Sequence, residues 1–415
     1  METLLKKKSI VYFFLASIVL LQFVITGTNP LELHANWSSH ELLVDYSYGF
    51  IRRGLMGSLV TLLSRIFQAD IYTVIIFTKL AGTIVFVALL FFYIYYFIKH
   101  TNARYAVVMV TLFVAMGGFS FYFLAWGEMD IYLLALTITA CFLIIKDRFL
   151  WLVPFLVAAC VMIHEGYVLM YFGIIIAILF YRATVDEDPK KRKKYWIILL
   201  STGLVASILF IYFYFFSTQV SSIHIDEVIR KTKQVLNEDF HIPDLKYIYV
   251  GNSEPNFAMW VDGKPTGHFL VRVLAVAMNT IVCLPIIIIL FNFWKTVISK
   301  NAERNKRLII VLCVASQLLT VPLVISHLDQ ARWFYDVVFF NFLFITAVIC
   351  IGDKSILFAA EKYFKPTVIT VAVIIFYFII CSFMDMQKIN ELYFQPISFF
   401  LKPFVQLIGR ENLHL

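Results

Sequence analysis

Residues 71–98 read IYTVIIFTKLAGTIVFVALLFFYIYYFI, and Lys79 is the sole charged side chain in this stretch. A helix needs about 20 mostly apolar residues to cross the hydrocarbon core of a bilayer, so the stretch predicts a membrane span. Comparable segments recur along the chain, and the short ones at 131–145, 149–163 and 166–181 are expected to lie inside the bundle. We predict eleven spans, at about 9–28, 71–98, 105–125, 131–145, 149–163, 166–181, 196–217, 268–294, 308–326, 333–351 and 367–384.

The composition excludes a soluble protein. Of the 415 residues, 61% are hydrophobic and 15% are charged, whereas soluble domains contain about 45–50% apolar and about 25% charged residues. The expected fold class is therefore all-α. We predict a single polytopic transmembrane helix bundle of about 11 spans, with an amphipathic juxtamembrane helix and a small outer cap loop.

The net charge of +8 is unevenly distributed along the chain. Lysine and arginine accumulate in the cytoplasmic loops of membrane proteins. A cytoplasmic N-terminus places most basic residues inside, including the run at 190–194, and most acids outside or within spans. The basic excess therefore reflects the membrane topology, and we expect no nucleic-acid partner. We predict a bacterial plasma (inner) membrane protein whose active site faces outward.

Several kinds of chemistry lack their usual sequence patterns. All six cysteines fall within predicted spans, where they are expected to be small buried hydrophobic side chains. The chain contains no P-loop, no dinucleotide fingerprint and no spacing typical of metal ligands. We therefore expect no cofactor and no metal site.

Residues 29–70 form the first predicted outer loop, which concentrates polar side chains in its middle. Residues 58–68 place apolar side chains at helical spacing with polar ones between them, which predicts an amphipathic helix lying on the membrane. The polar side chains before this helix include Glu41, Asp45, Tyr48, Arg52 and Arg53.

Other outer segments carry further charged clusters. Residues 218–267 predict a small cap over the bundle, and residues 385–415 predict an outer C-terminal tail. Charged groups at the ends of spans mark a functional site or a water-filled cavity by default. The clusters in the short outer connections contain Glu128, Asp130, His164, Glu165, His327, Asp329 and Arg332.

This layout resembles the GT-C class of polytopic membrane glycosyltransferases, which use polyprenyl-phosphate-linked sugars at the outer membrane face. The matching pieces are the long first outer loop, its carboxylate Asp45 or Glu41, and the helix at 58–68. The resemblance implies transfer of a sugar from a polyprenyl-phosphate-linked donor to an acceptor glycan or glycolipid, among membrane lipids.

The resemblance also implies roles for individual residues. Asp45 is the expected general base, with Glu41 and Asp130 as alternative catalytic carboxylates, because a carboxylate can take the proton of an attacking hydroxyl. Arginine binds phosphate through charge-assisted hydrogen bonds. The alternative to a catalytic role for Asp45 is a structural one, in which it pairs with Arg52 or Arg53 and holds the loop together. The expected substrate-binding residues are Arg52, Arg53, Tyr48, Glu128, His164, Glu165, His327 and Arg332.

Three other functions stay open at this level. A polysaccharide polymerase or ligase of the O-antigen type would also use outer arginines, and its products would form a ladder of lengths. A lipid-linked sugar transporter or flippase would move substrate without a covalent product. An acyltransferase that uses His164 is a weaker alternative.

Overall fold

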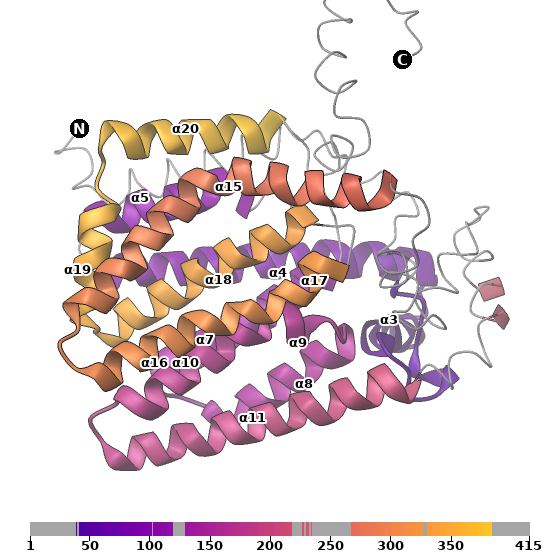
Figure 1. The fold of residues 1–415 in the computed structure, drawn as a ribbon. Coiled ribbons are helices and arrows are strands. Elements are labelled where there is room, and N and C mark those ends of the chain that lie inside the picture. The colour runs from indigo at the N-terminus through magenta and orange to yellow at the C-terminus, as the bar shows by residue number, and fades with distance from the viewer. Residues whose placement is uncertain are drawn as a thin grey trace, which may run out of the picture.

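The computed structural model describes residues 39, 41–101, 103–118, 129–217, 226–227, 230–231, 234, 267–326 and 330–383. Every regular element within these ranges is helical, as predicted, and Figure 1 shows the long helices running side by side. The elements are η1 Tyr46–Tyr48, α3 Gly54–Phe67, α4 Ile71–His100, α5 Ala103–Phe113, the π-helix η2 Val114–Gly118, α7 Met129–Lys146, η3 Leu150–Leu152, α8 Val153–Ile163, α9 Tyr167–Met170, α10 Phe172–Val185, α11 Pro189–Phe215, α15 Gly267–Lys300, α16 Arg304–Ala315, η4 Ser316–Thr320, α17 Val321–Ser326, α18 Gln330–Ile351, α19 Lys354–Tyr363 and α20 Val368–Phe383.

Five helical stretches in the described part are long and apolar enough to cross a membrane: Ile71–His100, Met129–Lys146, Pro189–Phe215, Thr280–Lys300 and Arg304–Leu323. Each overlaps a predicted span. Shorter apolar helices coincide with the predicted spans near 105, 149, 166, 333 and 367, and the predicted span 9–28 lies outside the described residues. The predicted tail at 385–415 and most of the segment at 218–267 lie outside them too.

The burial of these helices separates interior from lipid-facing positions. α7 is the most enclosed of the five, with 67% of its apolar window buried against 22% for α11. This agrees with the prediction that the short segment near 131–145 lies inside the bundle. α11 instead exposes large apolar side chains along its length, such as Leu200, Leu204 and Ile208, as a helix in contact with lipid does.

Helix α11 also defines the two ends of the bundle. Its first turn follows the N-cap Asp188, whose side chain accepts a hydrogen bond from Lys190 N at 2.8 Å. Its other end reaches the first loop, where the Tyr212 hydroxyl donates to Phe50 O at 3.0 Å. We call these the lysine-rich end and the first-loop end; a helix of this length separates them by about 40 Å.

Polar contacts between helices fix their packing. The Tyr93 hydroxyl on α4 lies 2.8 Å from Thr346 Oγ1 on α18. The Trp294 indole on α15 donates to Asn341 Oδ1 on α18 at 2.8 Å. In lipid, where apolar contact alone does little to associate helices, such hydrogen bonds specify which helices pair.

Helix α3 packs a face of small residues against the first loop. Gly54, Gly57, Ser58 and Thr61 recur at helical spacing on this face. A Cβ added at Gly57 would lie 1.9 Å from Val44 O, and Ser58 Oγ accepts a hydrogen bond from Tyr46 N at 2.9 Å. The other face exposes Leu59, Leu62, Ile66 and Phe67, so the predicted amphipathic helix is present, and its apolar face is open to the surroundings.

Replacing Gly57 with alanine is expected to destabilise the protein by about 3 kcal/mol, because the methyl group would overlap a backbone carbonyl that cannot rotate away. Gly203→Ala is the matched control, since no heavy atom beyond the neighbouring backbone of its own helix lies within 4 Å of the added Cβ. It should be neutral or stabilise α11 by up to about 1 kcal/mol. Thermal unfolding in detergent measures both, and equal midpoints for the two variants would contradict the packing described.

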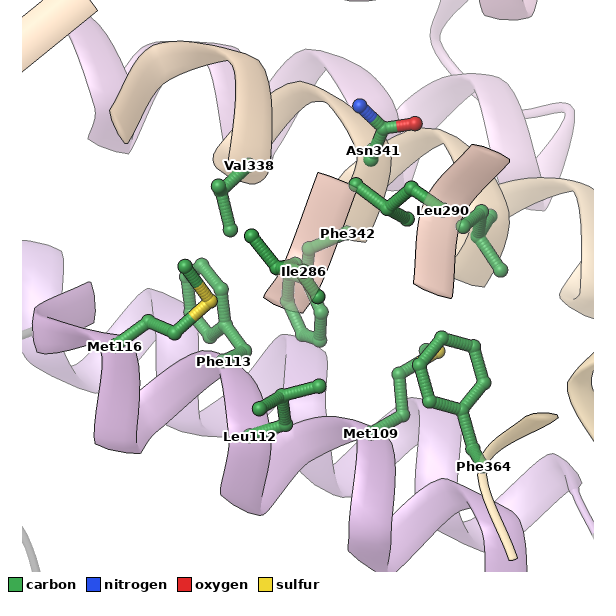
Figure 2. A pocket seen from close by; sticks show the side chains of 11 residues that line it. Met109, Leu112, Phe113, Met116, Ile286, Leu290, Val338, Asn341, Phe342 and Phe364 are labelled. Carbon is green, nitrogen blue, oxygen red and sulfur yellow. The ribbon is translucent and has the colours of Figure 1, made fainter. Parts of the chain in front are cut away.

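An apolar cavity lies between α5, η2, α15 and α18 (Figure 2). Its volume is about 30 Å³, which is room for about one water molecule. Asn341 brings the amide seen at its upper edge in Figure 2, and that amide also donates to Gln317 Oε1 at 2.9 Å. The cavity is therefore a packing gap within the bundle and is too small for a sugar.

Candidate functional site

The first loop places Asp45 at the start of η1. Its backbone is extended, and its side chain accepts a hydrogen bond from Ser47 N at 2.9 Å, which makes it the N-cap of that turn. Aspartate is a favoured N-cap because its oxygen satisfies a backbone donor that the helix leaves open. This cap fixes the direction of the carboxylate.

Asp45 is held by further donors from two other elements. Thr61 Oγ1 on α3 donates to Oδ2 at 2.8 Å, and Lys231 Nζ lies 3.0 Å from the same oxygen. The Ser47 hydroxyl also donates to Oδ1. Burial would raise the pKa of Asp45, but the donors on Ser47, Lys231 and Thr61 outweigh it, and the pKa lies below its ordinary value. Asp45 is therefore ionised at neutral pH.

Arg53 joins the first loop to the connection between α8 and α9. Its guanidinium forms a fork with Glu165, with Nε and Nη2 each 3.2 Å from a carboxylate oxygen. Nη1 donates to Glu41. The Arg53 backbone is left-handed, with φ 61°, a conformation that costs about 1 kcal/mol in a residue with a side chain.

Arg52 approaches the same carboxylate more loosely. Its Nη1 lies 3.9 Å from Glu165 Oε1, which is beyond hydrogen-bonding distance. Burial would raise the pKa of Glu165, but the charges of Arg53 and Arg52 outweigh it and hold the pKa well below its usual range. The Glu165 carboxylate is therefore a fixed anion between two arginines.

His164 belongs to the same connection and shapes it. The Gly166 backbone N–H donates to His164 Nδ1 at 2.9 Å. This bond turns the chain between α8 and α9, and it points Glu165 toward the arginines of the first loop.

Asp130 belongs to a second buried group at the start of α7. It is fully buried, and the Tyr171 hydroxyl donates to its Oδ1 at 3.2 Å. Tyr171 in turn packs its ring against Phe339 of α18. Through Tyr171, Asp130 is thus linked to α18.

The structure brings together a core of the predicted site. Glu41, Arg52, Arg53 and Glu165 form one ion-pair cluster, and Asp45 lies on the same loop, packed on α3. Tyr48 lies in η1 and Arg332 in α18, but their side chains are not among those described. Glu128, His327 and Asp329 lie outside the described residues.

Three partners of the site were not predicted from the sequence. Thr61 belongs to the small-residue face of α3, and the helical spacing of that face was a signal that could have identified it. Lys231 and Tyr171 are distant in sequence from the carboxylates that they contact, and no local pattern marks them.

A polar cleft of about 440 Å³ lies at the opposite, lysine-rich end. Two of its charged side chains pair with each other: Lys306 Nζ lies 2.7 Å from Asp353 Oδ2, and the Tyr181 hydroxyl donates to the same oxygen at 2.5 Å. These contacts lower the pKa of Asp353 to about 2 against the effect of burial. Neither this cleft nor the apolar cavity is lined by the first-loop carboxylates or arginines.

Comparison with known families, curated proteins and solved structures found no match to this chain. Among the described residues, no group of three or more histidine, cysteine or acidic side chains is placed to hold a metal ion.

Proposed function

We propose that the chain is a membrane-embedded glycosyltransferase, in which Asp45 is the general base. It would move a sugar from a polyprenyl-phosphate-linked donor to an acceptor glycan or lipid on the outer membrane face. One observation carries the proposal: a single loop at one end of the bundle holds a buried, ionised carboxylate, the buried Arg52 and the half-buried Arg53. The GT-C-like layout of the chain supports the same reading.

The carboxylate fits the attacking half of the reaction. The acceptor oxygen attacks the anomeric carbon, the bond from that carbon to the phosphate oxygen breaks, and the hydroxyl proton passes to Asp45. Asp45 is suited to this step because it is ionised, and because its N-cap and the Thr61 hydrogen bond fix its direction. A carboxylate that is already oriented loses little freedom when the substrate binds.

The arginines fit the leaving half of the reaction. Polyprenyl phosphate leaves with developing negative charge, which a guanidinium stabilises through charge-assisted hydrogen bonds. Arg53 is committed to its fork with Glu165 and to Glu41. Arg52 keeps a longer contact with Glu165, so we assign the phosphate to Arg52 and the support of the loop to Arg53.

The proposed topology agrees with this chemistry. Eleven spans with a cytoplasmic N-terminus place the lysine-rich end inside and the first-loop end outside, in a bacterial plasma membrane. The exposed apolar face of α3 would then enter the outer leaflet beside Asp45. A lipid-linked donor would reach the carboxylate from the bilayer.

Reconstituted protein supplied with a polyprenyl-phosphate hexose and a glycan acceptor tests the proposal. We expect a covalent product with a single added sugar and release of polyprenyl phosphate. A ladder of products would indicate a polymerase instead. Movement of the lipid-linked sugar across sealed vesicles without any covalent product would contradict the proposal and favour a transporter.

Arg52→Ala is expected to raise the KM for the lipid-linked donor about 10–100-fold, the range for loss of a hydrogen bond to a charged group. Arg52→Lys should recover part of this loss, since lysine keeps the charge without the planar fork. Arg65→Ala is the matched control, because Arg65 is exposed in the last turn of α3. Initial rates against donor concentration measure the effect, and an equal KM in wild type and Arg52→Ala would remove Arg52 from the phosphate site.

A further inference from the structure

Lys231 ties a distant part of the chain to the proposed base. Its Nζ lies 3.0 Å from Asp45 Oδ2, across 186 residues of sequence. The Lys231 side chain is 25% exposed and that of Asp45 is 4% exposed. The described residues 226–227, 230–231 and 234, which we call the Lys231 segment, are helical.

The hydrogen-bond donors around Asp45 differ in how firmly they are fixed. The Ser47 donors belong to the turn that Asp45 itself caps, and Thr61 belongs to α3, which the close contact between Gly57 and Val44 holds in place. Lys231 comes from a distant segment on a flexible side chain that is partly in solvent. It is therefore the donor that can leave Oδ2 without disturbing η1 or α3.

A general base must come within hydrogen-bonding distance of the proton that it takes. In this structure both oxygens of Asp45 already accept hydrogen bonds, and the carboxylate is almost fully buried. A hydroxyl can reach it only by replacing a donor. Of these donors, Lys231 Nζ is the one that can move away from Asp45 and leave its position to the hydroxyl.

Resting on the proposed function, we infer that the acceptor binds between α3 and the Lys231 segment. Its hydroxyl takes the place of Lys231 Nζ on Asp45 Oδ2, and it passes its proton to that oxygen as the sugar carbon is attacked. Lys231 is thus a positioning residue: between turnovers it keeps Asp45 ionised and covers it. The segment that carries Lys231 forms the acceptor side of the site.

Lys231 acts within a crowded electrostatic setting. A substitution at Lys231 alters one of several charges near Asp45. Its effect on the pKa of Asp45 must therefore be compared with that of a variant that keeps the positive charge at position 231. The other charged groups on the elements around Asp45 are Glu41, Arg52, Arg53, Arg65, Glu165, Asp226, Glu227 and Arg230.

Carboxyl labelling tests the contact without any need for activity. The intact protein in detergent is treated with a carbodiimide and glycine ethyl ester over a range of pH, and mass spectrometry follows labelling at Asp45. We expect Lys231→Met to increase the labelling and to shift its pH midpoint upward by about one pH unit, since an adjacent opposite charge lowers a carboxyl pKa by about 1–3 units. Lys231→Arg keeps the charge and should retain the protection.

Lys194→Met is the matched control, because Lys194 lies at the same distance, 3.0 Å, from Asp147 at the lysine-rich end. It should leave labelling at Asp45 unchanged. If Asp45 is labelled equally in wild type, Lys231→Met and Lys231→Arg, Lys231 does not cover it and the inference is wrong.

The transfer assay separates this inference from the proposed function. We expect Lys231→Met to lower the KM for the acceptor by up to about fivefold, as loss of a partly exposed competing ion pair allows, with the donor KM unchanged. If an active Lys231→Met enzyme has an unchanged KM for the acceptor, the inferred position of the acceptor is wrong, while the proposed function still stands. Full transfer by a variant that lacks the Asp45 carboxylate would overturn the proposed function and the acceptor position together, while the labelling result would still report the contact.

Discussion

Arg53→Ala is expected to destabilise the protein by about 3–5 kcal/mol, the cost of removing one partner from a buried ion pair. The variant would leave Glu41 and Glu165 facing each other without the guanidinium that now contacts both. Their side chains are 4% and 11% exposed, so water would compensate for the lost charge only poorly. The lost contact would also free the first loop from the connection between α8 and α9.

Two further variants separate the stability effect of the Arg53 charge from that of its left-handed backbone and from that of an exposed ion pair. Arg53→Gly relieves the left-handed backbone as well as removing the cation, so it should recover about 1 kcal/mol relative to Arg53→Ala. Lys194→Ala removes a cation from an exposed pair and should cost less than about 1 kcal/mol. Thermal unfolding in detergent measures all three. A midpoint for Arg53→Ala equal to that of Lys194→Ala would show that the cluster does not hold the loop.

The helical segments could be predicted from the sequence because apolar length alone decides them. The stretch at 71–98 becomes α4, and the short segment near 131–145 becomes the enclosed α7. Helix ends were less accurate. α11 begins at Pro189, ahead of the predicted start at 196, because Asp188 caps a turn made of lysine and arginine that composition alone assigns to a loop.

The site was predicted only in part, since composition cannot distinguish neighbouring residues of the same type. Arg52 and Arg53 are equivalent in the sequence, yet the left-handed backbone of Arg53 turns it into the fork with Glu165. The structural alternative, a pairing of Asp45 with one of these arginines, gives way to an ion pair of Asp45 with Lys231. Lys231 is 186 residues from Asp45 in the sequence, so only the tertiary structure brings the two together and no local spacing predicts the pair.

Asp45→Asn is expected to remove most of the transfer activity. The amide has nearly the same shape, and its oxygen can still accept from Ser47 while its nitrogen donates to Thr61 Oγ1, but it cannot take a proton at neutral pH. Loss of a general base costs about 10²–10⁴-fold in rate. Asp147→Asn is the matched control, because Asp147 also pairs with a lysine at 3.0 Å, at the end of the bundle away from the proposed site.

A single-turnover transfer assay tests the role of Asp45 as the general base. Wild type, Asp45→Asn and Asp147→Asn are reconstituted with a polyprenyl-phosphate hexose and an acceptor glycan, after thermal unfolding has confirmed that each is folded. We expect Asp45→Asn alone to lose transfer, by about 10²–10⁴-fold, while its donor affinity stays close to that of wild type. Transfer by a folded Asp45→Asn protein at the wild-type rate would contradict this role.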